Sequence, residues 1–343
     1  MRGSEYYRVT PVRVMTTGLV LSGILLGMIL FSLCLGPAGI SLKDALTWVT
    51  GSRSVDQTAW MILFKIRLPR ILLAGLVGFT LAFGGVVFQA LLRNPLAEPF
   101  ILGISSGAAV GTIIGIVLGL GFNLGVPLLS FMGAMFTILL VMGIAGRHGG
   151  LESSTLLLTG VIINAFFTAV IMFFIATTSG SRLHSMLFWL YGDLSQSRYV
   201  QLSIGLPLIL AVSGIIYFFS RHLNLIVGGE ESALQMGVEV ELLKWISFLG
   251  ISLMTGLVVS FSGIIGFVGL IVPHLMRMVL GADHRLLMPA AALGGAVFLI
   301  AADTFARTIL SPSELPVGVI TAFLGAPFFI YLLRQRGSQW TQS

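Results

Sequence analysis

Charged residues are scarce in this chain. They make up only 9% of its 343 residues, whereas 56% of the residues are apolar. A soluble globular domain has about 25% charged residues, so this composition excludes a soluble enzyme and an intrinsically disordered chain. The net charge of +6 is carried by arginines between apolar stretches, so we expect no nucleic-acid partner. The composition is typical of a protein that crosses a membrane several times.

Other missing residue types exclude further classes of protein. The single cysteine, Cys34, cannot form a disulfide within the chain or a cysteine-built zinc site. The three lysines, Lys43, Lys65 and Lys244, each follow Leu or Phe, so the chain lacks the Gly-Lys-Ser/Thr core of a P-loop. The five histidines are scattered and form no H-E-x-x-H motif. We therefore expect no catalytic residues, no metal site and no ATPase activity, and an intramembrane enzyme is the least favoured interpretation.

Eight stretches lack Asp, Glu, Lys and Arg altogether. Because a spanning helix needs about 20 apolar residues, stretches 99–146 and 245–276 should each hold two spans, divided near Gly121–Pro127 and Ser260–Gly263. The sequence thus predicts an all-α polytopic membrane protein with ten transmembrane helices, in one domain over 14–336 with tails at 1–13 and 337–343. The predicted spans are 14–35, 68–92, 99–120, 126–146, 153–177, 199–220, 244–262, 264–280, 286–306 and 316–333.

The basic residues predict the orientation of these spans. An even number of spans places both tails on one side of the membrane, and their arginines indicate that this side is the cytoplasm. Eleven basic residues then fall inside and eight outside, which is a weak bias. The outer excess lies mainly at residues 65–70, with Arg307 in a second outer loop. We expect an acidic partner to bind there.

Glycines and prolines predict how the helices pack and turn. Gly103, Gly107, Gly111, Gly115 and Gly119 recur every four residues, and such faces let helix backbones approach closely. Packing within one subunit is the favoured interpretation, ahead of a subunit interface or a moving contact. The segment 93–99, Arg-Asn-Pro-Leu-Ala-Glu-Pro, has two prolines that break the helices on either side and form a rigid turn.

Two polar segments are candidates for partner contacts. Arg67-Leu-Pro-Arg70 begins a predicted span, with Pro69 in its first turn. The two arginines could pair with carboxylates of a partner, or could snorkel to the membrane interface. In the loop 221–243, residues 230–237 predict a short helix that ends at Gly237. Such a helix suits a groove in a soluble partner, and an interfacial linker helix is the alternative.

Asp303 is the main acidic residue within a predicted span. An ion-coupled carrier needs acidic residues in mid-membrane, and Asp303 would be the coupling residue of such a secondary transporter. Arg307 follows four residues later, so the two side chains could instead form a neutral pair on one helix face. The ion-coupled transporter remains the alternative function.

Taken in order, the motifs resemble those of the FecCD-type permeases. These are the membrane subunits of binding-protein-dependent ABC importers for iron chelates, haem and cobalamin. The resemblance extends over about residues 15–336. It rests on R-L-P-R at 67–70, R-N-P-L-A-E-P at 93–99, I-L-G-I-S-S-G-A at 101–108, E-E-S-A-L-Q-M-G-V at 230–238, the run 262–277, and A-D-T-F-A-R at 302–307.

The resemblance implies a homodimer in the bacterial cytoplasmic (inner) membrane, with ten helices per subunit and the transport path on the two-fold axis. Two ABC ATPase subunits, which use ATP and Mg, would bind the inner face, and a substrate-binding protein would bind the outer face. The chain itself would hold no cofactor. Transport would proceed by alternating access, and family frequency favours an iron chelate (siderophore or haem) over cobalamin as cargo.

The resemblance also assigns roles to three groups of residues. The binding protein would dock on Arg67, Arg70 and Arg307. The cytoplasmic gate would be formed by Asn94, Leu96, Ser153 and Ser154. The loop that couples to the ATPase would include Glu230, Glu231, Ala233, Leu234, Gly237 and Val238.

Overall fold

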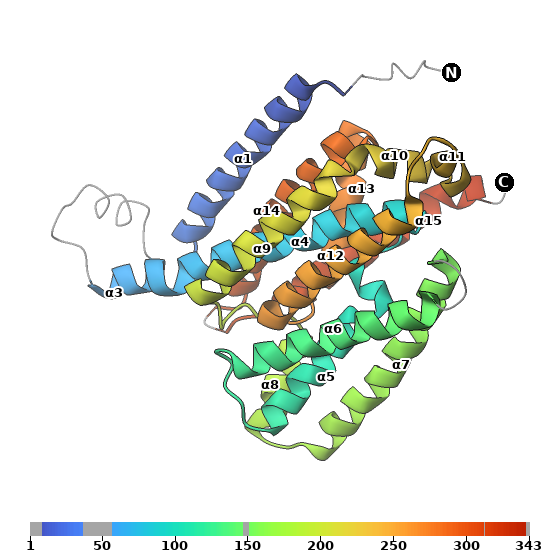
Figure 1. Ribbon diagram of the computed structural model, residues 1–343. Coiled ribbons are helices and arrows are strands. Elements are labelled where there is room, and N and C mark those ends of the chain that lie inside the picture. Colours follow the sequence, from blue (N-terminus) through green and yellow to red (C-terminus); the bar gives the residue numbers. More distant parts are fainter. Residues whose placement is uncertain (1–8, 37–56, 147–150, 312, 341–343) are drawn as a thin grey trace.

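The computed structural model describes residues 9–36, 57–146, 151–311 and 313–340, and these residues form helices and no strand (Figure 1). The predicted all-α fold is confirmed for this part of the chain. Within the described ranges, seven helical stretches are long and apolar enough to cross a membrane. They are α1 (Pro11–Cys34), the continuous run of α3, η1 and α4 (Gln57–Leu91), α6 (Gly125–Ala145), α7 (Ser153–Thr177), α9 (Tyr199–Phe218), α12 (Val240–Ser262) and α14 (His284–Thr308).

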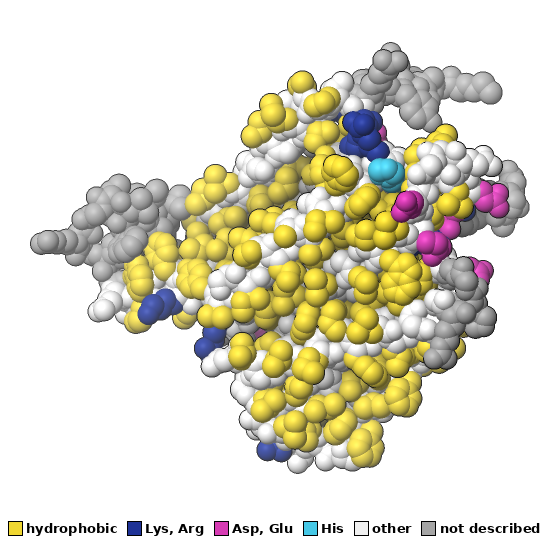
Figure 2. Space-filling model, viewed as in Figure 1, with side chains coloured by type: hydrophobic (Ala, Val, Ile, Leu, Met, Phe, Trp, Pro, Cys, Tyr) yellow, Lys and Arg dark blue, Asp and Glu magenta, His cyan; other side chains and the backbone are white. Residues whose placement is uncertain are grey.

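The remaining helices are shorter or only partly apolar. Three more contain apolar stretches of 10–17 residues: α5 (Ile104–Val117), α13 (Val268–Leu280) and the first part of α15 (Val317–Trp340). The others are η2 (Pro99–Leu102), α8 (Ser181–Leu190), α10 (Ser220–Val227) and α11 (Glu230–Gln235). Figure 2 shows hydrophobic side chains across the visible face, with the charged side chains at its edges. This distribution fits a bundle surrounded by lipid.

Helix α4 (Leu68–Leu91) is the centre of the bundle. It packs against α9, α12, α13 and α14, and 83% of the most apolar part of its helical run is buried (Figure 1). Its contact with α14 is so close that a Cβ atom on Gly78 would overlap the carbonyl oxygen of Gly295. Small residues permit such backbone contact where lipid supplies no hydrophobic drive between helices.

The glycine face at 103–119 packs inside the subunit, as the sequence analysis favoured. Side chains on Gly107 and Gly111 would overlap Gly133 and Leu129 of the neighbouring helix α6. A Cβ atom on Gly103 would also contact Thr137 of α6, at 3.4 Å, whereas one on Gly119 would meet nothing within 4 Å. Both lie beyond the ends of α5, with φ of 77° and 73°, conformations that favour glycine.

The helix that contains Pro69 begins before residue 68, where the predicted span starts. Residues Gln57–Trp60 (α3) and Met61–Arg67 (η1) continue directly into α4, and η1 is a π-helix. Proline lacks an N–H group, and its ring collides with the carbonyl of the preceding turn in a regular helix. The wider π-helical turn, in which Leu68 donates its N–H to Leu63, accommodates Pro69 without ending the helix.

The predicted division near Ser260–Gly263 coincides with the end of α12. Gly263 has φ of 69° and packs against the carbonyl of Trp189, at the end of α8. The N–H group of Asp193 donates to the carbonyl of Ser262 at 2.8 Å. Helix α8 lies in a segment for which only a loop was expected, because its 10 residues are too few to span a membrane.

Candidate functional site

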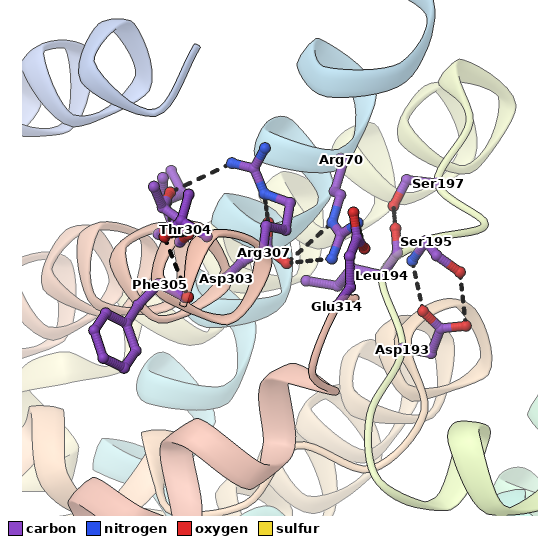
Figure 3. A network of polar contacts seen from close by, with 12 residues as sticks. Arg70, Asp193, Leu194, Ser195, Ser197, Asp303, Thr304, Phe305, Arg307 and Glu314 are labelled. Atoms are coloured by element: carbon purple, nitrogen blue, oxygen red, sulfur yellow. Dashed lines mark hydrogen bonds and ion pairs between the residues drawn. The ribbon is translucent and has the colours of Figure 1, made fainter. Parts of the chain in front are cut away.

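A cluster of charged side chains lies where α4 packs against α14, at the end of the bundle far from α11 (Figure 1 and Figure 3). Arg67, Arg70, Asp303, Arg307 and Glu314 form this arginine cluster. Arg70 pairs with Asp303 at 3.0 Å and with Glu314 at 2.6 Å. Arg307 pairs with the other oxygen of Asp303 at 3.1 Å. One buried carboxylate therefore joins two arginines from different helices.

The three arginines predicted to dock a binding protein are brought together, but they are buried. Arg67, Arg70 and Arg307 are only 4%, 7% and 3% exposed. Arg67 donates its Nη1 to the carbonyl of Leu33 at 2.9 Å, while its Nη2 has no hydrogen-bond acceptor among the described residues. The Glu314 side chain is 40% exposed and is the accessible member of the cluster. The docking role of the arginines stays a prediction.

Asp303 occupies a position that does not favour ion coupling. Its pairing with Arg307 across one helix turn, predicted from the sequence, is confirmed. Arg70 donates its Nε to Oδ1 of Asp303 at 3.0 Å, and Arg307 donates its Nε to Oδ2 at 3.1 Å. Because guanidinium groups already hold both oxygens, this carboxylate is a poor binding site for a transported cation.

Helix α11 lies at the opposite end of the bundle. Gly237 follows it with φ of 81°, so the predicted short helix with a glycine end is confirmed. Ala233 is fully buried and Val238 is 6% exposed, and these two residues anchor the segment to the bundle. Glu231 and Leu234 lie on its exposed face. The segment therefore presents a short, exposed helical face, and its contact with an ATPase stays a prediction.

Behind α11 lies a group of contacts that the sequence analysis did not identify. Lys244, in the first turns of α12, is 2% exposed and donates its Nζ to the Glu230 carboxylate at 2.6 Å and to the Leu151 carbonyl at 3.0 Å. Glu241 accepts the N–H of Leu151 at 3.0 Å. We call these four residues the Lys244 clamp. The sequence did contain one signal for these contacts: Lys244, one of only three lysines, stands at the start of an apolar span.

The predicted gate residues lie at helix ends. Asn94 accepts the N–H of Leu96 at 2.9 Å in the turn that follows α4, and Leu96 is 45% exposed. Ser153 is the first residue of α7 and is half-buried, whereas Ser154 is exposed. Both segments lie at the end of the bundle that holds α11 (Figure 1). Their role as a gate stays a prediction.

A cavity of about 420 Å³ lies between α5, α7 and α8. Ser105 and Ser106 of α5 and Asn164 and Thr168 of α7 supply its polar groups, and apolar side chains complete the wall. None of the described residues that line it is charged. Sequence reasoning did not assign these hydroxyl groups a role, because Ser and Thr are unremarkable within apolar helices. A mostly apolar wall with a few polar groups is typical of ligand sites.

The chain is similar to known transport proteins over almost its whole length. It is 44% identical over 282 residues to the cobalamin import system permease protein BtuC of Halobacterium salinarum. This alignment covers 82% of this chain and 76% of that protein. It is 41% identical over 320 residues to the hemin transport system permease protein HmuU of Yersinia pestis, covering 90% of this chain and 94% of that protein.

A solved structure has the same fold. It is described as a metal-chelate type ABC transporter in an inward-facing conformation, and it matches with a TM-score of 0.83 and 31% identity. The match covers 94% of this chain and 99% of the solved one. The family pattern itself extends over residues 24–335. On this evidence the chain belongs to the FecCD transport family.

Proposed function

We propose that this chain is the permease subunit of an ATP-driven ABC importer that moves a metal chelate into the cytoplasm. The observation that carries the proposal is the similarity of nearly the whole chain to permeases named for cobalamin and hemin. The cargo is an iron siderophore, haem or cobalamin. The uncharged cavity of α5, α7 and α8 supports this class, because a large and rigid chelate needs a wide path rather than a tight site.

In this proposal the chain crosses the bacterial inner membrane ten times, with both termini in the cytoplasm. The seven long apolar helices and the three shorter ones supply the spans. Two copies form a homodimer, and the cavity of each copy faces the shared axis. Two ATPase subunits bind the α11 segments, and a substrate-binding protein binds at the arginine cluster.

Alternating access couples these parts. The loaded binding protein docks, ATP draws the two ATPases together, and α11 passes this movement to the gate at Asn94, Leu96, Ser153 and Ser154. Docking at the arginine cluster is supported by its charge balance, because three arginines stand beside two carboxylates and the excess positive charge suits an acidic partner.

Affinity purification of the chain from its native membranes tests the proposal. A P-loop ATPase should co-purify at one copy per permease in mild detergent, and mass spectrometry should detect it. A reconstituted uptake panel of radiolabelled haem, cobalamin and ferric siderophore would then identify the cargo. A chain that purifies alone, and whose transport ignores ATP, would contradict the proposal.

The docking role of the arginines has a separate test. Arg67→Gln should weaken binding of the substrate-binding protein at low salt, because it removes one positive charge from the arginine cluster. Arg182→Gln removes an exposed arginine outside the cluster and serves as the matched control. Equal affinities for Arg67→Gln and the unmodified permease would contradict this role.

A further inference from the structure

The Lys244 clamp joins three segments, of which the one at Leu151 lies 93 residues from Lys244 in the sequence. Glu230 begins α11, Lys244 lies in α12, and Leu151 stands two residues before the start of α7. The Lys244 Nζ contacts the first and the third of these segments at 2.6 and 3.0 Å. Lys244 is therefore a direct physical connection between α11 and the beginning of α7.

Leu151 is held from both sides of its peptide backbone. Its carbonyl accepts from Lys244, and its N–H donates to Glu241 at 3.0 Å, so side chains of the first two turns of α12 bind both polar groups of its backbone. Its side chain is only 1% exposed. A segment held in this way must follow α12 when α12 moves. The next residues are Ser153 and Ser154, which the proposed function places in the inner gate.

The chemistry of Lys244 suits a rigid connection. A lysine that is 2% exposed is costly to bury unless its ammonium group is paired and hydrogen-bonded. Losing Glu230 would remove the nearer of the two carboxylates beside this buried charge, since Glu241 lies 3.9 Å from the ammonium group. Movement of Glu230 is therefore opposed unless Lys244 follows it. The exposed residues of α11 have no such connection to α7 among the described contacts.

We propose that Lys244 is the positioning residue that transmits movement of α11 to the inner end of α7. This inference rests on the proposed function, because it needs an ATPase that moves α11. In this role the ammonium group makes no contact with cargo or nucleotide. It keeps Glu230 and Leu151 at a fixed separation, so that displacement of the coupling helix displaces the gate.

The test uses the complete importer in lipid nanodiscs and reports on the gate directly. The reporter is Ser154→Cys in a Cys34→Ser background, which removes the single native cysteine. The rate of labelling by a membrane-impermeant maleimide is measured without nucleotide and with ATP. The test variants are Lys244→Met and the conservative Lys244→Arg. Glu239→Gln, on an exposed residue next to α12, is the matched control for loss of one charge.

ATP should change the labelling rate in the parent, in Glu239→Gln and in Lys244→Arg. In Lys244→Met that ATP-dependent change should fall about tenfold, the scale of an ordinary conformational coupling, while ATP hydrolysis and ATPase co-purification persist. A full ATP-dependent change in Lys244→Met would overturn the inference. A parent that binds no ATPase and shows no ATP response would instead overturn the proposed function, and the inference with it.

A second variant guards against loss of folding in Lys244→Met. The double substitution Lys244→Met with Glu230→Leu removes both charges of the pair, of which Lys244 is buried and Glu230 half-buried, and puts apolar side chains in their place. It should assemble and hydrolyse ATP, yet show no gate response. A normal gate response in the double variant would overturn the inference, because the clamp would then serve stability alone.

Discussion

Asp303 neutralises the positive charges that lie between α4 and α14. It is 1% exposed and lies between the guanidinium groups of Arg70 and Arg307. Arg307 also donates its Nη2 to Ser32 of α1 at 2.9 Å, so the network extends to a third helix. The buried arginines depend on this carboxylate, because without it two positive charges would face each other away from water.

Asp303→Asn should therefore destabilise the permease severely, by about 3–5 kcal/mol, the usual cost of breaking a buried ion pair. Glu314→Gln, in the exposed partner of Arg70, should cost about 1 kcal/mol or less. Thermal unfolding in one detergent compares the two variants. A stable, monodisperse Asp303→Asn protein whose uptake had lost dependence on an ion gradient would instead support the ion-coupled transporter.

Asp283 gives a residue-scale prediction of pH dependence. Its carboxylate caps the N-terminus of α14, accepts the Arg285 N–H at 3.0 Å and accepts from Asn224 at 3.0 Å. Burial raises the pKa of Asp283, but hydrogen bonds from Arg285 and Asn224 outweigh it and lower the pKa to about 2. This contribution to stability is therefore complete above the unfolded-state pKa of about 4 and is lost as the pH falls toward 2.

Asp283→Ala should lower stability by about 1 kcal/mol at neutral pH, the usual value of an N-cap. The difference in thermal midpoint from the unmodified protein should be constant from pH 8 to pH 5 and shrink below about pH 4. A difference that vanished by pH 6 would show that the Asp283 carboxylate is not held in its ionised form.

At the scale of helices, close backbone contact organises the bundle. Gly111 of α5 lies against the carbonyl of Leu129, whereas a Cβ atom on Gly143 of α6 would meet nothing within 4 Å. Gly111→Ala should therefore cost about 1–3 kcal/mol through overpacking. Gly143→Ala should be neutral, or stabilising by up to about 1 kcal/mol. Thermal midpoints measured side by side check this, and equal midpoints for the two variants would contradict tight α5–α6 packing.

Helix α11 depends on the conformation of Gly237. Its φ is 81°, and open space surrounds it, so a substitution there acts through backbone strain alone. Gly237→Val should distort the end of α11 and uncouple ATP hydrolysis from uptake, while Gly237→Asn, which tolerates this conformation, should retain coupling. The measurement is the ratio of cargo imported to ATP hydrolysed. Identical ratios for the two variants would argue against a coupling role.

Local signals explain which elements could be predicted. The end of α11 at Gly237, the break after Ser262 and the glycine face of α5 each depend on neighbours in the sequence. The burial of the arginine cluster and the contacts of the Lys244 clamp depend instead on residues far apart in the sequence. Arg70 and Asp303 are separated by 233 residues, and Lys244 and Leu151 by 93. The motifs identified the arginines and the spacing predicted the pair of Asp303 with Arg307, but only tertiary packing shows that Arg70 also pairs with Asp303 and Glu314.

At the scale of the whole molecule, the charged side chains lie apart from the cavity of α5, α7 and α8. Charged side chains gather at the two ends of the bundle, in the arginine cluster and around α11, while the cavity of α5, α7 and α8 is lined by uncharged residues. A carrier that used an ion gradient would need an ionisable residue along its path. An importer driven by a separate ATPase needs none there, and in the proposed function its driving force enters at the end that holds α11.

Uptake by proteoliposomes that contain the purified permease and its co-purifying ATPase tests this account most directly. Radiolabelled haem, cobalamin and ferric siderophore are offered together with the binding protein, with and without ATP, and with ion gradients imposed or collapsed. The account predicts that one of these chelates accumulates only with ATP and that collapsing the gradients changes nothing. Uptake that survives the removal of ATP and stops when the gradients collapse would contradict it.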